Sequence, residues 1–120
     1  IEINPEFVEA IVDRGKLMDE LERYTEALND YEMAINKAPG YPESYYNRGV
    51  TLAKLGRKMD AVMDITQALE LDPKNSLYSY GLGIVLIQAG KVEQALRFLD
   101  HSADLGRTEA KELAANIRSQ

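Results

Sequence analysis

Few residues in this chain could support catalysis. Its 120 residues include one histidine, His101, and no cysteine. A Ser-His-Asp triad would have to use His101, and its neighbour Ser102 falls at a position that packs between helices. Helical spacing places His101 on the outward side of its helix, where a hydrated surface histidine is expected. We therefore predict that the chain is not an enzyme.

An acidic stretch, MDELERYTEALNDYE at residues 18–32, could hold a cation or supply paired carboxylates for acid–base chemistry. It lacks the Asp-x-Asp-x-Asp-Gly loop of an EF-hand, and its apolar residues have helical spacing. The expected role is a hydrated charged surface, so we predict no metal site and no cofactor. The same negative charge could attract a basic partner.

Two glycines one residue apart, Gly81 and Gly83, raise the alternative of a strand that leads into a phosphate-binding loop. They lie in SYGLGIVLIQAG at residues 79–90, where three β-branched residues favour a strand locally. Neither a third glycine nor a Gly-Lys-Ser/Thr sequence follows at the required spacing. We predict instead a helix in which Gly83 is a packing glycine and Gly81 is its chance neighbour.

The charge of the chain restricts its partners. It carries 14 Lys and Arg against 20 Asp and Glu, a net charge of −6, and residues 1–41 hold ten of these acids and four of the bases. A nucleic-acid binder needs a basic face, so we predict no nucleic-acid partner. No apolar run reaches eighteen residues, which predicts no membrane span. The opening IEINPEF has neither a basic leader nor an apolar signal core, and we favour the cytoplasm.

Small residues and prolines recur at one fixed spacing along the chain. The recurring positions are Gly15, Gly49 and Gly83, then Ala27, Ala61 and Ala95, then Pro5, Pro39 and Pro73. Each unit holds two segments of helical apolar spacing separated by a break such as Gly56. Because proline cannot continue a helix interior, Pro39 and Pro73 close one unit and open the next. The pattern predicts an all-α array of helix-turn-helix units in which glycine and alanine allow close helix packing.

This unit resembles the tetratricopeptide repeat, whose pattern is W-x2-L-G-x2-Y, then A-x3-F, then P, in a unit of about 34 residues. Three copies match, at residues 8–41, 42–75 and 76–109. The resemblance implies an α-solenoid of three such units in a single domain, residues 1–120. Residues 1–7 would be the end of a preceding repeat, and residues 108–120 would form a C-terminal capping helix, since their apolar residues share one face.

Several positions depart from the family pattern. Arg14 and Arg48 stand where the pattern has leucine, Ser79 replaces a large aromatic residue, and Arg107 replaces the closing proline. These departures make the packing of the third repeat the weakest part of the fold prediction.

In this family the first helix of each repeat lines a concave groove that holds peptides or helices of partners. By the resemblance, the groove positions of this chain are Val12, Lys16, Tyr46, Asn47, Val50, Leu77, Tyr80, Ile84 and Ile87. Repeat one would offer charge, whereas repeats two and three would offer aromatic and aliphatic side chains. The expected ligand is a protein or peptide with apolar anchors and a basic flank.

Some tetratricopeptide domains hold the C-terminal carboxylates of a chaperone with a clamp of lysine, asparagine and arginine. The corresponding positions here are Val12, Lys16, Asn47, Leu77 and Gly81, and only Asn47 agrees with the clamp. The pattern therefore disfavours a carboxylate-clamp chaperone tail as the ligand.

Two other functions stay open from the sequence. The apolar surface of repeat three or the truncated N-terminal helix could meet a second copy of the chain, which would make the module a self-association scaffold and a homo-oligomer. The module could also be the substrate-positioning arm of an enzyme.

Overall fold

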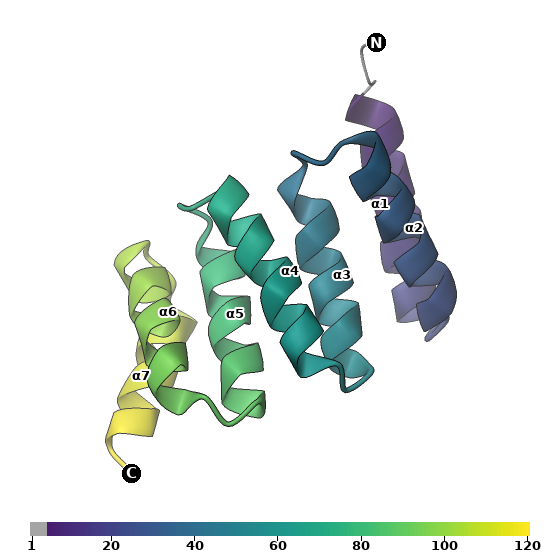
Figure 1. Ribbon diagram of the computed structural model, residues 1–120. Helices are drawn as coiled ribbons and strands as arrows, with labels where there is room; N and C mark the ends of the chain where they lie inside the picture. Colours follow the sequence, from purple (N-terminus) through teal and green to yellow (C-terminus); the bar gives the residue numbers. More distant parts are fainter. Residues whose placement is uncertain (1–4) are drawn as a thin grey trace.

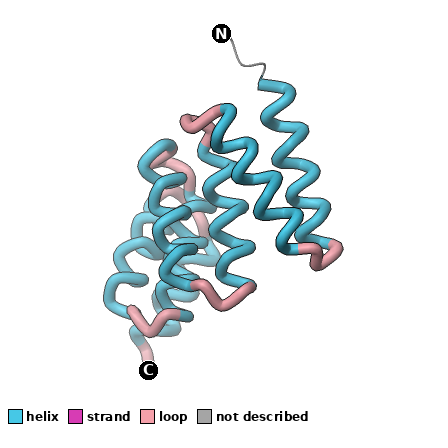
Figure 2. The backbone as a smooth tube through the Cα atoms, turned by 45° about the vertical axis from the view of Figure 1, so that its right-hand side comes forward, coloured by secondary structure: helices cyan, strands magenta, loops and turns pink. Residues whose placement is uncertain are grey.

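The computed structural model describes residues 5–120 and shows seven α-helices and no strand in that part of the chain. The helices are α1 (Pro5–Glu20), α2 (Tyr24–Lys37), α3 (Pro42–Lys54), α4 (Lys58–Leu71), α5 (Ser76–Gln88), α6 (Val92–Asp104) and α7 (Thr108–Arg118). Short loops join them throughout (Figure 2). The predicted all-α class is confirmed.

The helices form antiparallel pairs that stack in sequence order. Figure 1 shows α1 with α2 at one end, α3 with α4 and α5 with α6 following, and α7 at the other end. Each second helix also packs against the first helix of the next pair, and α7 packs against α6. The array measures 49 × 27 × 19 Å along its principal axes. This is an α-solenoid of helix pairs, as the sequence predicts, and a seventh helix, α7, packs against the last pair.

The recurring glycines are the points of closest approach within each pair. A Cβ atom placed on Gly49 would lie 2.7 Å from Cγ1 of Ile65 and 3.1 Å from the carbonyl oxygen of Ala61. At Gly83 the corresponding distance to Cδ2 of Leu99 is also 2.7 Å, and at Gly15 a ring atom of Tyr31 lies 2.5 Å away. Carbon atoms cannot approach so closely, so these positions require glycine.

The apolar stretch at residues 79–90 lies almost entirely in α5, so the strand alternative is wrong for it. Leu82 and Leu86 are buried in the core cluster that α3 to α6 share. Burial of a whole apolar face is worth more than the local β preference of isoleucine and valine, because propensity differences are at most about 1 kcal/mol per residue.

The departures in repeat three are accommodated by hydrogen bonds. The hydroxyl of Ser79 donates to the carbonyl oxygen of Phe98 at 2.6 Å, and that of Ser102 donates to the carbonyl oxygen of Ser76 at 2.8 Å. Both serines are fully buried, and each satisfied hydroxyl ties one helix of the pair to the backbone of the other. Repeat three therefore packs as a normal helix pair.

The start of the array differs from the sequence prediction. In the structure α1 begins at Pro5, three residues before the predicted start of repeat one at residue 8. Pro5 can occupy the first position of a helix because its missing N–H would have no partner there. The rest of the proposed segment, residues 1–4, lies outside the described residues.

Substitution of Ala61 tests the close approach of α3 and α4. Ala61 is fully buried against the position of Gly49. We expect Ala61→Leu to lower the free energy of unfolding by about 1–3 kcal/mol through overpacking, measured by urea denaturation. The control is Ala115→Leu at an exposed position of α7, which should change stability by less than about 0.5 kcal/mol. Equal stability of the two variants would contradict this packing.

The turn of repeat one offers a second test. Gly56 and Gly90 have φ values of 82° and 80° in the turns of repeats two and three, whereas the corresponding Glu22 has φ 58°. A left-handed conformation costs a side-chain-bearing residue about 1 kcal/mol or more. We therefore expect Glu22→Gly to raise the free energy of unfolding by about 1 kcal/mol relative to Glu22→Ala, which removes the charge equally. A less stable Glu22→Gly variant would contradict the argument.

Candidate functional site

A largely apolar pocket lies in the groove between α3 and α5. Its volume is about 360 Å³. The residues that line it are Tyr46, Val50, Ala53, Lys54, Ile65, Leu77, Tyr80, Gly81, Ile84, Val85 and Gln88. Five of the predicted groove residues, Tyr46, Val50, Leu77, Tyr80 and Ile84, are thus brought together in one pocket.

Gly81 positions one wall of this pocket. A Cβ atom on Gly81 would lie 2.8 Å from Cε1 of Tyr46, so the absent side chain is what lets the tyrosine ring lie against α5. The same ring stacks on Tyr78, with ring centroids 4.8 Å apart. The interpretation of Gly81 as a chance neighbour of Gly83 is therefore wrong. Its signal in the sequence is that Gly81 shares a helical face with Leu77 and Ile84.

Burial dominates the chemistry of these tyrosines. It raises the pKa of Tyr46 above its usual value, and burial with nearby negative charge raises the pKa of Tyr78 to about 12. Both hydroxyls therefore stay protonated at neutral pH.

Arg107 lies over the ring of Tyr80, one of the residues that line the pocket. Its guanidinium carbon lies 5.8 Å from the ring centroid of Tyr80, and its Nε donates to the hydroxyl of Ser76 at 3.1 Å. The residue that replaces the closing proline of the repeat thus orients Tyr80. Sequence reasoning recorded the replacement but did not predict this contact.

At the other end of the groove, charged residues of repeat one pair with repeat two. Nζ of Lys16 lies 3.4 Å from Oε1 of Glu43, and Asp19 accepts hydrogen bonds from Thr51 and Lys54. Lys16 is exposed at the predicted position, but its ammonium group already forms an ion pair with Glu43.

Acidic side chains gather around Tyr41 beside this end. The tyrosine donates to Oε2 of Glu43 at 3.1 Å. Burial first, then this hydrogen bond and the charges of Glu43, Glu9 and Asp13, raise the pKa of Tyr41 to about 12. Glu9 and Asp13 are exposed, so their charge is available to a ligand.

Three predicted groove residues have other roles. Val12 is fully buried in the core of repeat one, against which Tyr41 also packs, because its short side chain does not reach beyond the helix pair. Ile87 packs between the core of α3 to α6 and the cluster that α7 closes, and it does not line the pocket. The side-chain amide of Asn47 donates to the carbonyl oxygen of Glu43 in its own helix.

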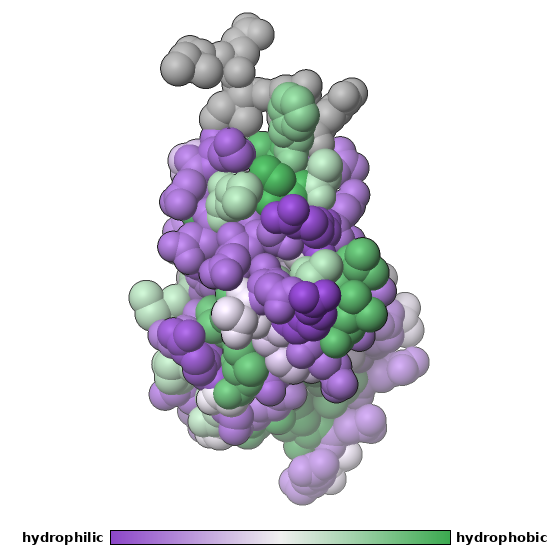
Figure 3. Space-filling view, turned by 90° about the vertical axis from the view of Figure 1, so that its right-hand side faces the viewer, coloured by the Kyte–Doolittle hydropathy of each residue, from purple (hydrophilic) through white to green (hydrophobic). Residues whose placement is uncertain are grey.

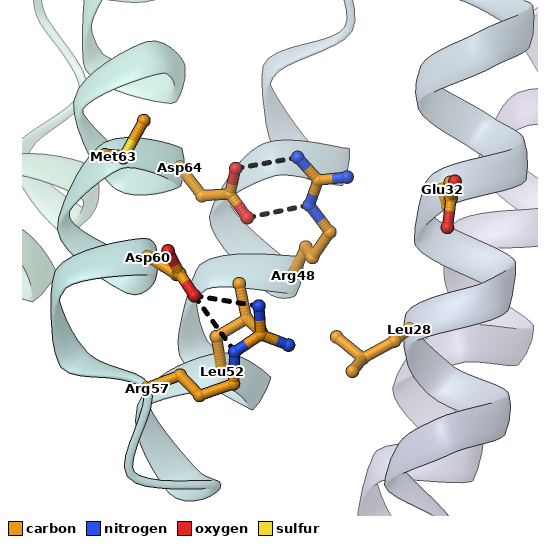
Figure 4. Close-up of a pocket in the computed structure, with 8 residues that line it drawn as sticks. All are labelled: Leu28, Glu32, Arg48, Leu52, Arg57, Asp60, Met63 and Asp64. Carbon is orange, nitrogen blue, oxygen red and sulfur yellow. Dashed lines mark hydrogen bonds and ion pairs between the residues drawn. The ribbon is translucent and has the colours of Figure 1, made fainter.

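Ion pairs on the side of α2 and α4 accommodate two departures from the family pattern, and one of them lines a second pocket. There Nε and Nη2 of Arg48 donate to the carboxylate of Asp64 at 2.7 and 2.8 Å, beside an ion pair between Arg57 and Asp60 (Figure 4). Arg14 pairs with Asp30 in the same way, one repeat earlier. Each arginine that replaces a leucine is thus matched by an aspartate on the second helix of the same repeat.

The residues that could support other chemistry lie apart. His101 is exposed, and its Nε2 lies 2.9 Å from the carbonyl oxygen of Pro73, whereas Ser102 is buried and bonded to the backbone. Within residues 5–120, no three acidic or histidine side chains lie close enough together to hold a metal ion. The helices of the same part of the chain are too short or too polar to span a membrane.

Repeated helix pairs that stack in order and pack closely at recurring glycines define this chain as a helical-repeat solenoid. Family models assign the repeat. A model described as TPR repeat matches residues 15–56, and two models described as tetratricopeptide repeat match residues 42–75 and 59–117. The chain belongs to the tetratricopeptide repeat family. No curated protein matches it in sequence.

Solved structures share this fold at low sequence identity. The first TPR of Spaghetti (RPAP3), bound to the HSP90 peptide SRMEEVD, has a TM-score of 0.90 and 19% identity over 99% of this chain and 96% of that one. MamA has a TM-score of 0.78 and 19% identity over 86% and 60%. A Thermobaculum terrenum O-GlcNAc transferase mutant has a TM-score of 0.81 and 22% identity, over 88% of this chain but only 20% of that one. These similarities show the fold alone.

The ion pair of repeat two yields a stability test. Asp64 is 7% exposed, so Arg48→Leu would leave a buried carboxylate without its partner. We expect this variant to lose about 3 kcal/mol of unfolding free energy. The double variant Arg48→Leu/Asp64→Phe has the same residue types as Leu82 and Phe98 at the corresponding positions of repeat three. It should regain most of the lost stability, measured by thermal denaturation. A double variant as unstable as the single one would contradict this account.

Proposed function

We propose that this chain is a protein-binding module without chemistry of its own, and that its groove holds an extended peptide or a helix of a partner. The pocket between α3 and α5 carries this proposal. Its walls are mostly carbon, and Leu77 at its edge is 40% exposed. Exposed apolar surface of this kind, rimmed by tyrosines, is typical of interaction sites.

The charged residues near the groove indicate which part of the ligand is basic. Glu9 and Asp13 remain exposed at the α1 end of the groove, while Lys16 and Lys54 are engaged by acids of the chain. A ligand that places apolar side chains in the pocket and lysine or arginine toward α1 would gain Coulomb attraction without losing these pairs.

The same geometry disfavours an acidic chaperone tail such as SRMEEVD. Of the positions that would form a carboxylate clamp, Val12 is buried in the core, and Leu77 and Gly81 offer no cation. Lys16 and the amide of Asn47 are bonded to Glu43. Carboxylates placed here would meet apolar walls and a nearby glutamate, which costs desolvation without a matching ion pair.

A second copy of the chain is the alternative occupant of the groove. Met63, on the α4 side, is 70% exposed and could supply an apolar anchor. Such a contact joins two different surfaces and therefore predicts assembly that grows with concentration.

Calorimetric titration tests the groove. The probe is a ten-residue peptide with two lysines followed by leucine and phenylalanine residues. We expect Leu77→Asp to weaken its binding at least tenfold, because the charge would enter the apolar pocket. Leu77 is the second residue of α5, where an acid suits the helix N-terminus, so the variant should fold.

Met63→Asp is the matched control, since it places the same charge on an exposed apolar residue away from the groove, and it should bind like wild type. The peptide SRMEEVD should bind more weakly than the basic probe. Equal affinity of wild type and Leu77→Asp for the basic probe would refute groove binding. Sedimentation equilibrium of wild type and Leu77→Asp tests whether a second copy of the chain occupies the groove.

A further inference from the structure

A polar pocket lies between α2 and the pair of α3 and α4, apart from the groove. Its volume is about 370 Å³. Leu28 and Glu32 of α2 stand on one side of it, and Arg48 of α3 and Asp64 of α4 stand on the other (Figure 4). None of the residues that line it also lines the groove pocket. The two pockets can therefore be tested separately.

Two guanidinium groups each present a free end to this pocket. Nε and Nη2 of Arg48 are bonded to Asp64, and Nε and Nη2 of Arg57 lie 2.9 and 2.8 Å from Oδ2 of Asp60. In Figure 4 the remaining nitrogen of each group points away from its aspartate, toward the side of α2. Within residues 5–120 neither of these Nη1 groups donates a hydrogen bond. The pocket thus offers N–H donors whose positive charge is balanced by the paired aspartates.

Glu32 supplies an acceptor on the opposite wall. It is exposed, and no ion pair within residues 5–120 involves it. Its charge reaches the other wall, since the pKa of Arg48 is raised first by the hydrogen bonds to Asp64 and then by the charges of Asp64 and Glu32. A ligand between the two walls would meet donors on one side and a carboxylate on the other.

The rest of the lining is apolar. Leu28 and Leu52 contribute carbon, and Met63 is 70% exposed. The unbranched thioether of methionine adapts to the shape of a ligand. Figure 3 views the α1–α2 end of the molecule and shows separate apolar areas among polar ones. Binding beside α2 therefore depends on matched polar groups as well as on apolar contact.

The fold does not require the ion pair at this position. In repeat three Leu82 and Phe98 stand at the positions of Arg48 and Asp64, and α5 and α6 pack as a pair in the same way. A buried ion pair is often no more stable than apolar side chains of similar volume. A variant without the ion pair can therefore test binding while the fold is kept.

Charge limits which ligand can enter. Two arginines and three acids line the pocket, which gives a net charge of −1. A carboxylate would reach the N–H donors only beside Asp60, Asp64 and Glu32, which repel it. A lysine would be attracted by Glu32, but it has no acceptor for the two guanidiniums. A primary amide carries an acceptor oxygen and two N–H donors on one neutral, planar group, so it matches both walls.

We propose that this pocket binds the side chain of a glutamine in a partner protein. The amide oxygen accepts from Nη1 of Arg48 and of Arg57. The amide nitrogen donates to Glu32, and the methylene groups of the stem lie against Leu28 and Met63. This is an interaction surface on the side of the second helices, and it does not depend on binding in the groove.

NMR titration with short peptides tests the site. The probe is acetyl-Ala-Leu-Gln-Leu-Ala-amide, and the matched controls carry glutamate or lysine in place of the glutamine. We expect the glutamine peptide to shift the methyl signal of Met63 and the Nε–H signals of Arg48 and Arg57. It should bind more tightly than either control by about fivefold or more, because only the amide pairs with both walls.

Variants locate the bound probe. Arg48→Leu/Asp64→Phe and Glu32→Ala should each weaken the glutamine peptide by about fivefold or more. Glu70→Ala, at an exposed acid outside the pocket, is the matched control for Glu32→Ala and should bind like wild type. The groove variant Leu77→Asp should also bind like wild type. Thermal denaturation checks that every variant is folded.

Other results would overturn the proposal. Unchanged Met63 and arginine signals in wild type would exclude the site, and equal binding by wild type and Glu32→Ala would exclude the acceptor. Tighter binding of the glutamate or lysine peptide would mean that the pocket selects a charged group. Loss of binding in Leu77→Asp alone would place the probe in the groove, which would support the proposed function but not this site.

Discussion

The close approach of the two helices in each repeat is the constraint on which the rest of the structure depends. A single Cβ at Gly49 or Gly83 would lie 2.7 Å from a side-chain carbon of the second helix. Because this contact recurs in every repeat, each first helix holds the same orientation relative to its second helix. That constancy aligns the first helices along one groove, and it gives each first helix the same second face for stacking.

The fold could be predicted from the sequence because this contact depends directly on residue identity. Only glycine fits where backbone and side chain meet, so the equal spacing of Gly15, Gly49 and Gly83 defines the helix pairs. The apolar groove follows from the same period, since Tyr46 and Tyr80 occupy one repeat position and Val50 and Ile84 the next. These four side chains do line one pocket.

What the sequence could not predict depends on side-chain length and on partners distant in the chain. Val12 shares its repeat position with Tyr46, but a valine is too short to extend past the helix pair and is fully buried. Lys54 and Asp19 are 35 residues apart, and their pairing requires the relative position of two repeats. The pairing of Arg48 with Asp64 does leave a signal in the sequence, because Arg14 and Asp30 repeat the same two residue types at the same spacing.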